Sequence, residues 1–89
     1  MEEKKIFASA ISVFGAKHQE DIAIEEMSEL TQAVLHNRRG RAANIPEEIA
    51  DVLIAVEQLI IIHDCKEEVE SIKYHKLMRL QEKVFNECV

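Results

Sequence analysis

Helix-breaking residues are scarce in this chain, whose 89 residues include two glycines and one proline. Glycine and proline most often end helices and form turns, so the long stretches between Gly15, Gly40 and Pro46 favour continuous helices. Hydrophobic residues make up 47% of the chain, which is typical of a folded domain rather than a disordered one. The sequence therefore predicts a single all-α domain over residues 1–89.

Four helices are predicted from the spacing of the apolar residues and from the breaks between them. Gly15 is placed to end the first helix in a left-handed conformation, and a basic loop, NRRGRAAN, surrounds Gly40. Pro46 suits the first turn of the third helix, where Asn44 and Glu47 have the spacing of a capping box. The expected helices span about residues 2–14, 18–37, 46–63 and 65–86.

The third predicted helix is apolar nearly all round, which indicates a buried central helix. A chain this short buries only about 60–65% of the surface of its unfolded form, so its core is marginal. Three short neighbours cannot cover such a helix. We therefore expect a four-helix bundle completed by oligomerisation, in a homodimer or homotetramer where the third helix and parts of the first and fourth pack across subunits.

Charge and cysteine usage exclude several classes of protein. The formal net charge of -6 argues against a protein that mainly binds a nucleic acid polymer. The longest apolar run, Val52–Ile62, is interrupted by Glu57 and Gln58 and is shorter than the ~18 residues of a membrane span, so no membrane association is expected. Cys65 and Cys88 lack metal-ligand spacing, and the opening MEEKK lacks a signal-peptide pattern, so we expect free thiols and a cytoplasmic location.

Five acidic residues stand on two predicted helices, close to positions where apolar contacts are expected. On the second helix, Glu25, Glu26 and Glu29 lie beside the core stripe at about 100° of rotation per residue. On the third helix, Glu48 and Asp51 project on the same side as the apolar residues. Partly buried carboxylates are costly unless they are paired or bind a cation. An oxygen-only ligand set suits Mg²⁺, with Mn²⁺ as the alternative, and phosphates of a substrate commonly complete the shell of such an ion.

Each group of acids also has a purely structural interpretation. Taken alone, Glu25, Glu26 and Glu29 are typical of a solvated helix shoulder, and Glu48 can complement the dipole at a helix N-terminus. Capping does not explain Asp51, which lies a turn further into the helix. The combination of both helices therefore favours the metal-binding hypothesis.

The spacing of these acids resembles a known motif. Glu25-Glu26-x-x-Glu29, followed after eighteen residues by Glu48-x-x-Asp51, is similar to the EExxE…ExxD signature of the all-alpha nucleoside triphosphate pyrophosphohydrolases, the MazG-like superfamily. Further similarity, over essentially the whole chain, lies at Phe14-Gly15, Gln19, Leu30, Ala33, IPEEIADVLI (45–54) and YHKLMRLQEK (74–83). Two positions depart from the family pattern, since Met78 stands where Asn is frequent and Phe14 where Trp is frequent.

The resemblance implies a Mg²⁺-dependent enzyme that cleaves an NTP or dNTP between its α and β phosphates and releases a monophosphate and pyrophosphate. It implies that Glu26, Glu29, Glu48 and Asp51 bind the metal. Glu25 would be a further ligand or would orient the attacking water, which makes Glu25, Glu26 and Glu29 the expected catalytic residues.

The resemblance also implies substrate-binding roles for Gln19, Lys73, Lys76 and Arg79, the last two as phosphate ligands. The three cations are equally well explained as ordinary surface charge near the C-terminal half of a helix. The alternative is a non-catalytic protein of the same fold, which would serve as a helical nucleotide-sensing or partner-binding module. A redox di-metal bundle is disfavoured, because it needs Glu-x-x-His pairs and no histidine here follows a glutamate at that spacing.

Overall fold

The computed structural model describes residues 2–88, and within that range every regular element is an α-helix. The predicted number and order of helices are confirmed, and their ends agree with the predicted ends to within two residues. In this described part, no helix is at once long and apolar enough for a membrane span. The helices are α1 (Glu3–Phe14), α2 (Ala16–Arg38), α3 (Ile45–Ile62) and α4 (Lys66–Cys88).

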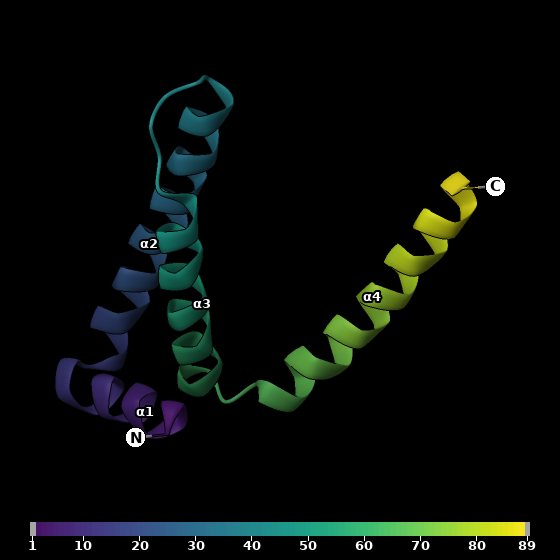
Figure 1. Ribbon diagram of the computed structural model, residues 1–89. Coiled ribbons are helices and arrows are strands. Elements are labelled where there is room, and N and C mark those ends of the chain that lie inside the picture. Colours follow the sequence, from purple (N-terminus) through teal and green to yellow (C-terminus); the bar gives the residue numbers. More distant parts are fainter. Residues whose placement is uncertain (1, 89) are drawn as a thin grey trace.

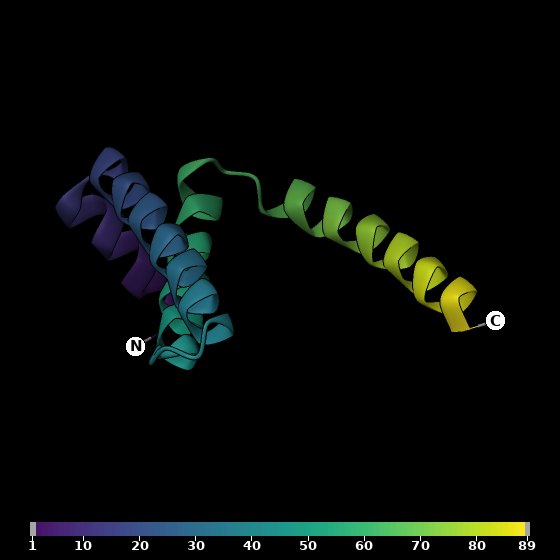
Figure 2. The ribbon, with the colours of Figure 1, turned by 90° about the horizontal axis from the view of Figure 1, so that it is seen from above.

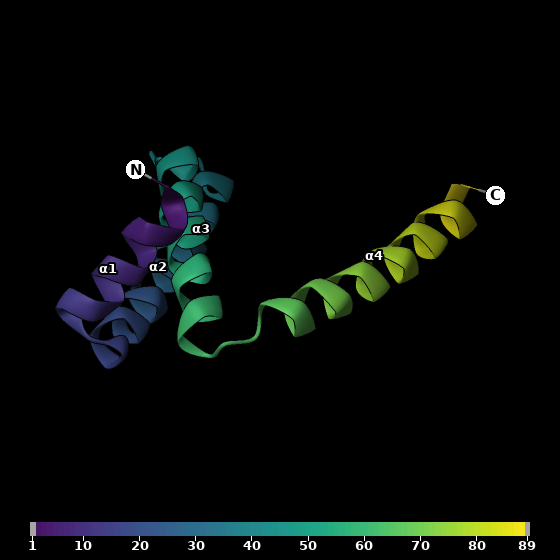
Figure 3. The same cartoon turned by 90° about the horizontal axis from the view of Figure 1, so that it is seen from below.

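A single glycine joins α1 to α2. Gly15 has φ 95° and ψ 146°, its N–H donates to the Ile11 carbonyl (2.9 Å), and its carbonyl accepts from the Gln19 N–H (3.1 Å). The predicted break is thereby confirmed, with a backbone conformation that is essentially restricted to glycine. The sharp corner lays α1 across the base of the other two helices, as seen from below in Figure 3.

The helices α2 and α3 form an antiparallel hairpin that packs side by side along most of its length (Figure 1). A capping box holds the start of α3, as the spacing predicted: Asn44 Nδ2 donates to Glu47 Oε2 (2.9 Å), and the Glu47 N–H donates to Asn44 Oδ1 (3.3 Å). This cap holds the first turn of α3 in helical form, and Glu48 belongs to that turn.

The core of the three packed helices is built mostly from small residues. Ala23 and Ala33 of α2 and Ala55 of α3 are buried, together with Phe7 of α1, and no large side chain is completely buried. Small side chains let α2 and α3 approach closely. The outer face of α3 stays exposed within one chain, with Leu53 at 61% of its full accessibility, so the expected burial of α3 on all sides is not reached by a single copy.

The fourth helix does not join the bundle formed by the other three. It contacts only α3, at the end of that helix, and projects away from the hairpin (Figures 1 and 2). The connection causes this: Asp64 adopts a left-handed φ of 48°, and the Cys65 N–H donates to the Ile60 carbonyl (3.2 Å), which closes α3 and redirects the chain. The expected four-helix bundle is therefore a three-helix unit with one separate helix in a single copy.

We expect Gly15→Ala to lower the free energy of unfolding by about 1–3 kcal/mol, because an alanine at this φ and ψ is strained. A Cβ at this position meets no atom within 4 Å, so the loss reports backbone strain alone. Urea unfolding at fixed protein concentration measures it. Ser12→Ala, at an exposed position in α1, is the control and should change stability by less than about 0.5 kcal/mol. Equal effects of the two substitutions would contradict this account of the corner.

Candidate metal centre

Three carboxylates converge where α2 lies against the first turn of α3. Glu26 and Glu29 are three residues apart on α2 and so share one side of it, and the antiparallel packing brings Glu48 of α3 to the same place. One oxygen from each of the three lies within 4.8 Å of the other two. All three belong to the metal-ligand set that the sequence predicts.

Two oxygens of this cluster are buried and lack a hydrogen-bond partner. They are Glu26 Oε2 and Glu48 Oε2, which belong to half-buried side chains on opposite helices. A buried acceptor without a partner is costly, and a buried charged acceptor more so. A cation between the helices would remove this cost, because both oxygens would then bind it as ligands.

The electrostatics of the cluster also favour a bound cation. The pKa of Glu26 is raised above its ordinary value of 4.5, first by burial and then by the charges of Glu29, Asp51 and Glu48. The pKa of Glu48 is raised first by burial and then by the charges of Glu29, Asp51 and Glu47. Repulsion among these carboxylates is therefore mutual. In residues 2–88 the contact within 4 Å between a basic and an acidic side chain is that of His63 Nε2 with Glu20 Oε2 (3.1 Å), so no lysine or arginine of the same chain is paired with the cluster.

The other two predicted acids stand at the edge of the cluster. Asp51 is half-buried, and its charge raises the pKa of both Glu26 and Glu48, but it is outside the set of three carboxylates whose oxygens lie within 4.8 Å of one another. Glu25 is exposed and outside the set of three mutually close carboxylates. This position suits a group that contacts water better than one that binds a metal directly.

Gln19, predicted to bind substrate, is buried between the helices. Its Nε2 donates to Gln58 Oε1 (2.7 Å), and its own Oε1 lies 2.9 Å from His18 Nδ1. Sequence reasoning missed Gln58 as a member of this polar pair. The available signal was a lone amide within the apolar run Val52–Ile62, at a position that α3 turns toward α2.

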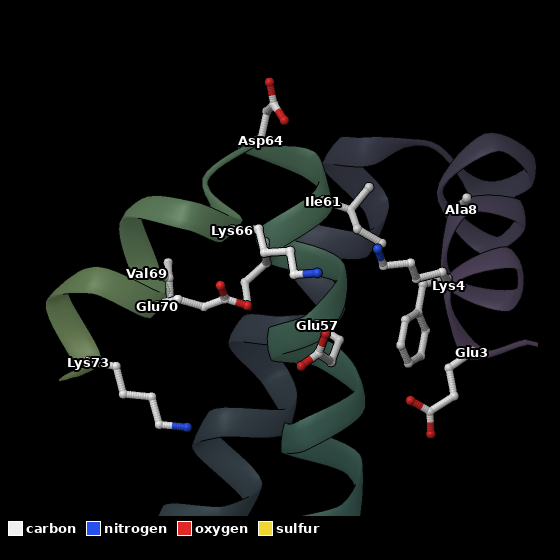
Figure 4. A pocket seen from close by; sticks show the side chains of 12 residues that line it. Glu3, Lys4, Ala8, Glu57, Ile61, Asp64, Lys66, Val69, Glu70 and Lys73 are labelled. Atoms are coloured by element: carbon white, nitrogen blue, oxygen red, sulfur yellow. The ribbon is translucent and has the colours of Figure 1, made fainter. Parts of the chain in front are cut away.

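The predicted cations do not reach the carboxylates of their own chain. Lys73, Lys76 and Arg79 belong to α4, which has no contact with α2 and meets α3 at the end opposite Glu48. Lys73 lines a groove of about 630 Å³ where α1, α3 and α4 meet; Figure 4 shows it on the α4 side, with Glu57 of α3 at the centre. A single copy therefore presents the acids and the cations on separate surfaces.

The chemistry of the donor set is that of a hard-cation site. Carboxylate oxygens alone, without histidine or cysteine, suit Mg²⁺ or Mn²⁺ rather than zinc or copper. Three carboxylates leave coordination positions for water and for a ligand such as phosphate. Comparisons of the chain with protein-family models, with curated proteins and with solved structures each find no match.

The raised pKa values predict how the stability of the metal-free protein depends on pH. Because the folded chain favours the protonated forms of Glu26 and Glu48, their stabilising contribution is complete below pH 4.5 and is lost as the pH rises through the raised values. In the presence of a chelator, the free energy of unfolding attributable to the cluster should therefore fall as the pH rises above 4.5.

The neutral variant Glu48→Gln should flatten this dependence, whereas Glu57→Gln, on the exposed side of α3, should leave it unchanged. Denaturant unfolding between pH 4 and pH 8 provides the measurement. If Glu48→Gln leaves the pH dependence of the free energy of unfolding unchanged, the carboxylates of the cluster do not repel one another as described.

The Gln19–Gln58 pair gives a separate prediction. Gln58→Leu leaves the Gln19 amide buried without its partner and should lower the free energy of unfolding by about 1–3 kcal/mol. The double variant Gln19→Leu/Gln58→Leu removes both polar groups and should recover most of that loss, as judged by thermal unfolding. If the double variant is the least stable of the three, the pair is not a mutually satisfied buried contact.

Proposed function

We propose that this protein is a Mg²⁺-dependent nucleoside triphosphate pyrophosphohydrolase of the MazG-like kind, which hydrolyses an NTP or dNTP to a monophosphate and pyrophosphate. The observation that carries the proposal is the convergence of Glu26, Glu29 and Glu48, with two buried oxygens that lack partners. Such oxygens on facing helices are explained by a cation, and a hard, partly hydrated cation is the usual partner of substrate phosphates.

Each acid has a distinct part in this proposal. Glu26, Glu29 and Glu48 would hold the ion, and Asp51 would add negative charge and a further ligand from the next turn of α3. Glu25, which is exposed beside the cluster, orients the attacking water and accepts its proton. When bound there, Mg²⁺ would polarise the phosphate and neutralise charge on the departing pyrophosphate. Water adds to the α phosphate, the bond to the β phosphate breaks, and the released pyrophosphate carries the electron pair.

The buried amide pair contributes through position rather than by contact with the ion. Gln19 and Gln58 link α2 to α3, and their hydrogen bond holds the two helices in the register that sets the acids opposite one another. A short, buried side-chain contact of this kind keeps ligand-bearing helices from sliding. Specificity for a base would depend on the surface around Phe14, which is 61% exposed and has the ring of His18 tilted beside it, with ring centroids 5.8 Å apart.

The proposal predicts that pyrophosphate and a monophosphate appear in equal amounts when the protein is incubated with Mg²⁺ and a panel of NTPs and dNTPs. Glu29→Gln and Asp51→Asn should each reduce turnover by at least about 100-fold, since loss of a ligand exceeds the roughly 10–100-fold cost of losing an outer-shell partner. Ion chromatography or a coupled pyrophosphate assay measures both products.

Glu57→Gln is the matched control, because it removes a carboxylate from α3 on the side away from the cluster. It should retain the wild-type rate. Turnover that survives both Glu29→Gln and Asp51→Asn would refute the enzymatic proposal. Saturable nucleotide binding in calorimetry without any product would instead identify a nucleotide-sensing module of the same fold.

A further inference from the structure

The loop between α2 and α3 carries most of the arginine of the chain. Three of the four arginines, Arg38, Arg39 and Arg41, lie within four residues, whereas the other basic charges are one arginine and seven lysines spread over α1, α2 and α4. No acidic residue occurs between Glu29 and Glu47, although 17 of the 89 residues are acidic. In a chain with a formal net charge of -6, this segment is therefore a local concentration of positive charge.

Backbone hydrogen bonds hold this loop in a defined conformation. The Gly40 N–H donates to the Asn37 carbonyl (3.1 Å), and the Arg41 N–H donates to the His36 carbonyl (2.8 Å). Gly40 has a positive φ of 74°, which allows the tight turn after the helix. All three arginines are exposed, and within residues 2–88 none lies within 4 Å of an acidic side chain. Their guanidinium groups can therefore bind a ligand without first breaking an ion pair.

The turn places Arg41 above the side of α2 that carries Glu29. Arg41 lies next to His36 through their hydrogen bond. His36 follows Glu29 by seven residues, which is two helical turns on the same side and about 10 Å along the axis. From the tip of α2 the chain returns to the start of α3, whose first turn holds Glu48 (Figure 1). The loop and the carboxylate cluster of Glu26, Glu29 and Glu48 are therefore at the same end of the hairpin.

This separation fits a bridging anion better than a direct ion pair. An extended arginine side chain reaches about 6 Å from its backbone, given bonds of roughly 1.5 Å, so Arg41 covers little more than half of the distance to the level of Glu29. A phosphate in the remaining space would contact the guanidinium on one side and a cation held by the carboxylates on the other. Arginine suits this position, because its planar fork of N–H donors binds two phosphate oxygens at once.

Arg38 has a different setting, although it lies next to the same loop. It follows Glu29 by nine residues, which places it about 180° away on the opposite side of α2. It also belongs to the last turn of α2, where a cation complements the negative end of the helix dipole. The dipole therefore explains Arg38 but not Arg41, which lies beyond the end of the helix.

We propose that Arg41, with Arg39 beside it, binds the terminal phosphates of a nucleotide whose α phosphate lies at the carboxylate cluster. This subsite rests on the proposed function, and it assigns the leaving pyrophosphate to the loop. The guanidinium charge stabilises the electron pair that pyrophosphate takes when the bond between the α and β phosphates breaks. A ligand with three phosphates is favoured over one with two, because a diphosphate lacks the γ phosphate that reaches the loop.

Calorimetry with inorganic tripolyphosphate and Mg²⁺ tests the subsite without any turnover. Arg41→Ala should weaken binding at least about tenfold, because it removes a charge-assisted pair of hydrogen bonds. Arg38→Ala removes the same charge from the opposite side of α2 and should weaken binding less than about twofold. Both residues are exposed, so urea unfolding should find both variants folded. Equal losses for the two variants, or a wild type that binds no tripolyphosphate, would overturn the subsite.

Two further titrations decide what the loop binds. Omission of Mg²⁺ should remove most of the tripolyphosphate binding of the wild type, because the anion bridges the loop and the ion. Binding that is equally tight without Mg²⁺ would separate the loop from the carboxylate cluster and overturn the proposal. The same holds if Arg41→Ala loses affinity for a single-stranded oligonucleotide but not for tripolyphosphate, since the loop would then bind a nucleic acid polymer.

Steady-state kinetics separate the subsite from the proposed activity. Arg41→Ala should lower kcat/KM for an NTP at least about tenfold and leave that for the corresponding NDP nearly unchanged, whereas Arg38→Ala should alter neither. Arg41→Lys should recover only part of the loss, since lysine keeps the charge but not the fork of donors. Equal losses for NTP and NDP would overturn the assignment of the γ phosphate to the loop. If wild type turns over no nucleotide, the proposed function fails, while calorimetry still decides the subsite.

Discussion

The close packing of α2 on α3 is the interaction on which the rest of this structure depends. Ala23, Ala33 and Ala55 are buried where larger residues would hold the helices apart, so the two backbones come near enough for carboxylates from both to meet. The same contact leaves little apolar surface buried, because alanine contributes little of it. The hairpin thus brings polar groups from two helices close together, but it buries only a small apolar core.

The close packing of α2 on α3 leaves the carboxylates in an unfavourable arrangement in the metal-free chain. Glu26 and Glu48 are held with a raised pKa and with oxygens that have no partner, and Glu29 and Asp51 add repulsion. Strain of this kind concentrates at functional sites, where a ligand relieves it. Binding of a cation would therefore stabilise the folded chain as well as prepare the site, since the ion favours the only state in which its ligands are assembled.

Local patterns in the sequence were enough to predict the helices, the glycine corner and the cap at Asn44, because each depends on residues close together in the chain. The meeting of Glu26, Glu29 and Glu48 followed from helical spacing plus one short loop. The separate path of α4 could not be predicted in this way, because it depends on the left-handed conformation of Asp64. Aspartate tolerates this φ but also adopts many others, so its presence in the sequence does not predict the turn. Gln58 was missed because a lone amide in an apolar run does not reveal its partner.

The change of chain direction at Asp64, which separates α4 from the other helices, has a consequence for biosynthesis. The elements from α1 to α3 are complete before α4 leaves the ribosome, so the hairpin can form as a local, first-order event. Within residues 2–88, no other element of the chain covers α4 after it is made, since α4 contacts only α3. The exposed turns of α4 are therefore expected to open locally more often than the α2–α3 contact, and proteases should cut there first.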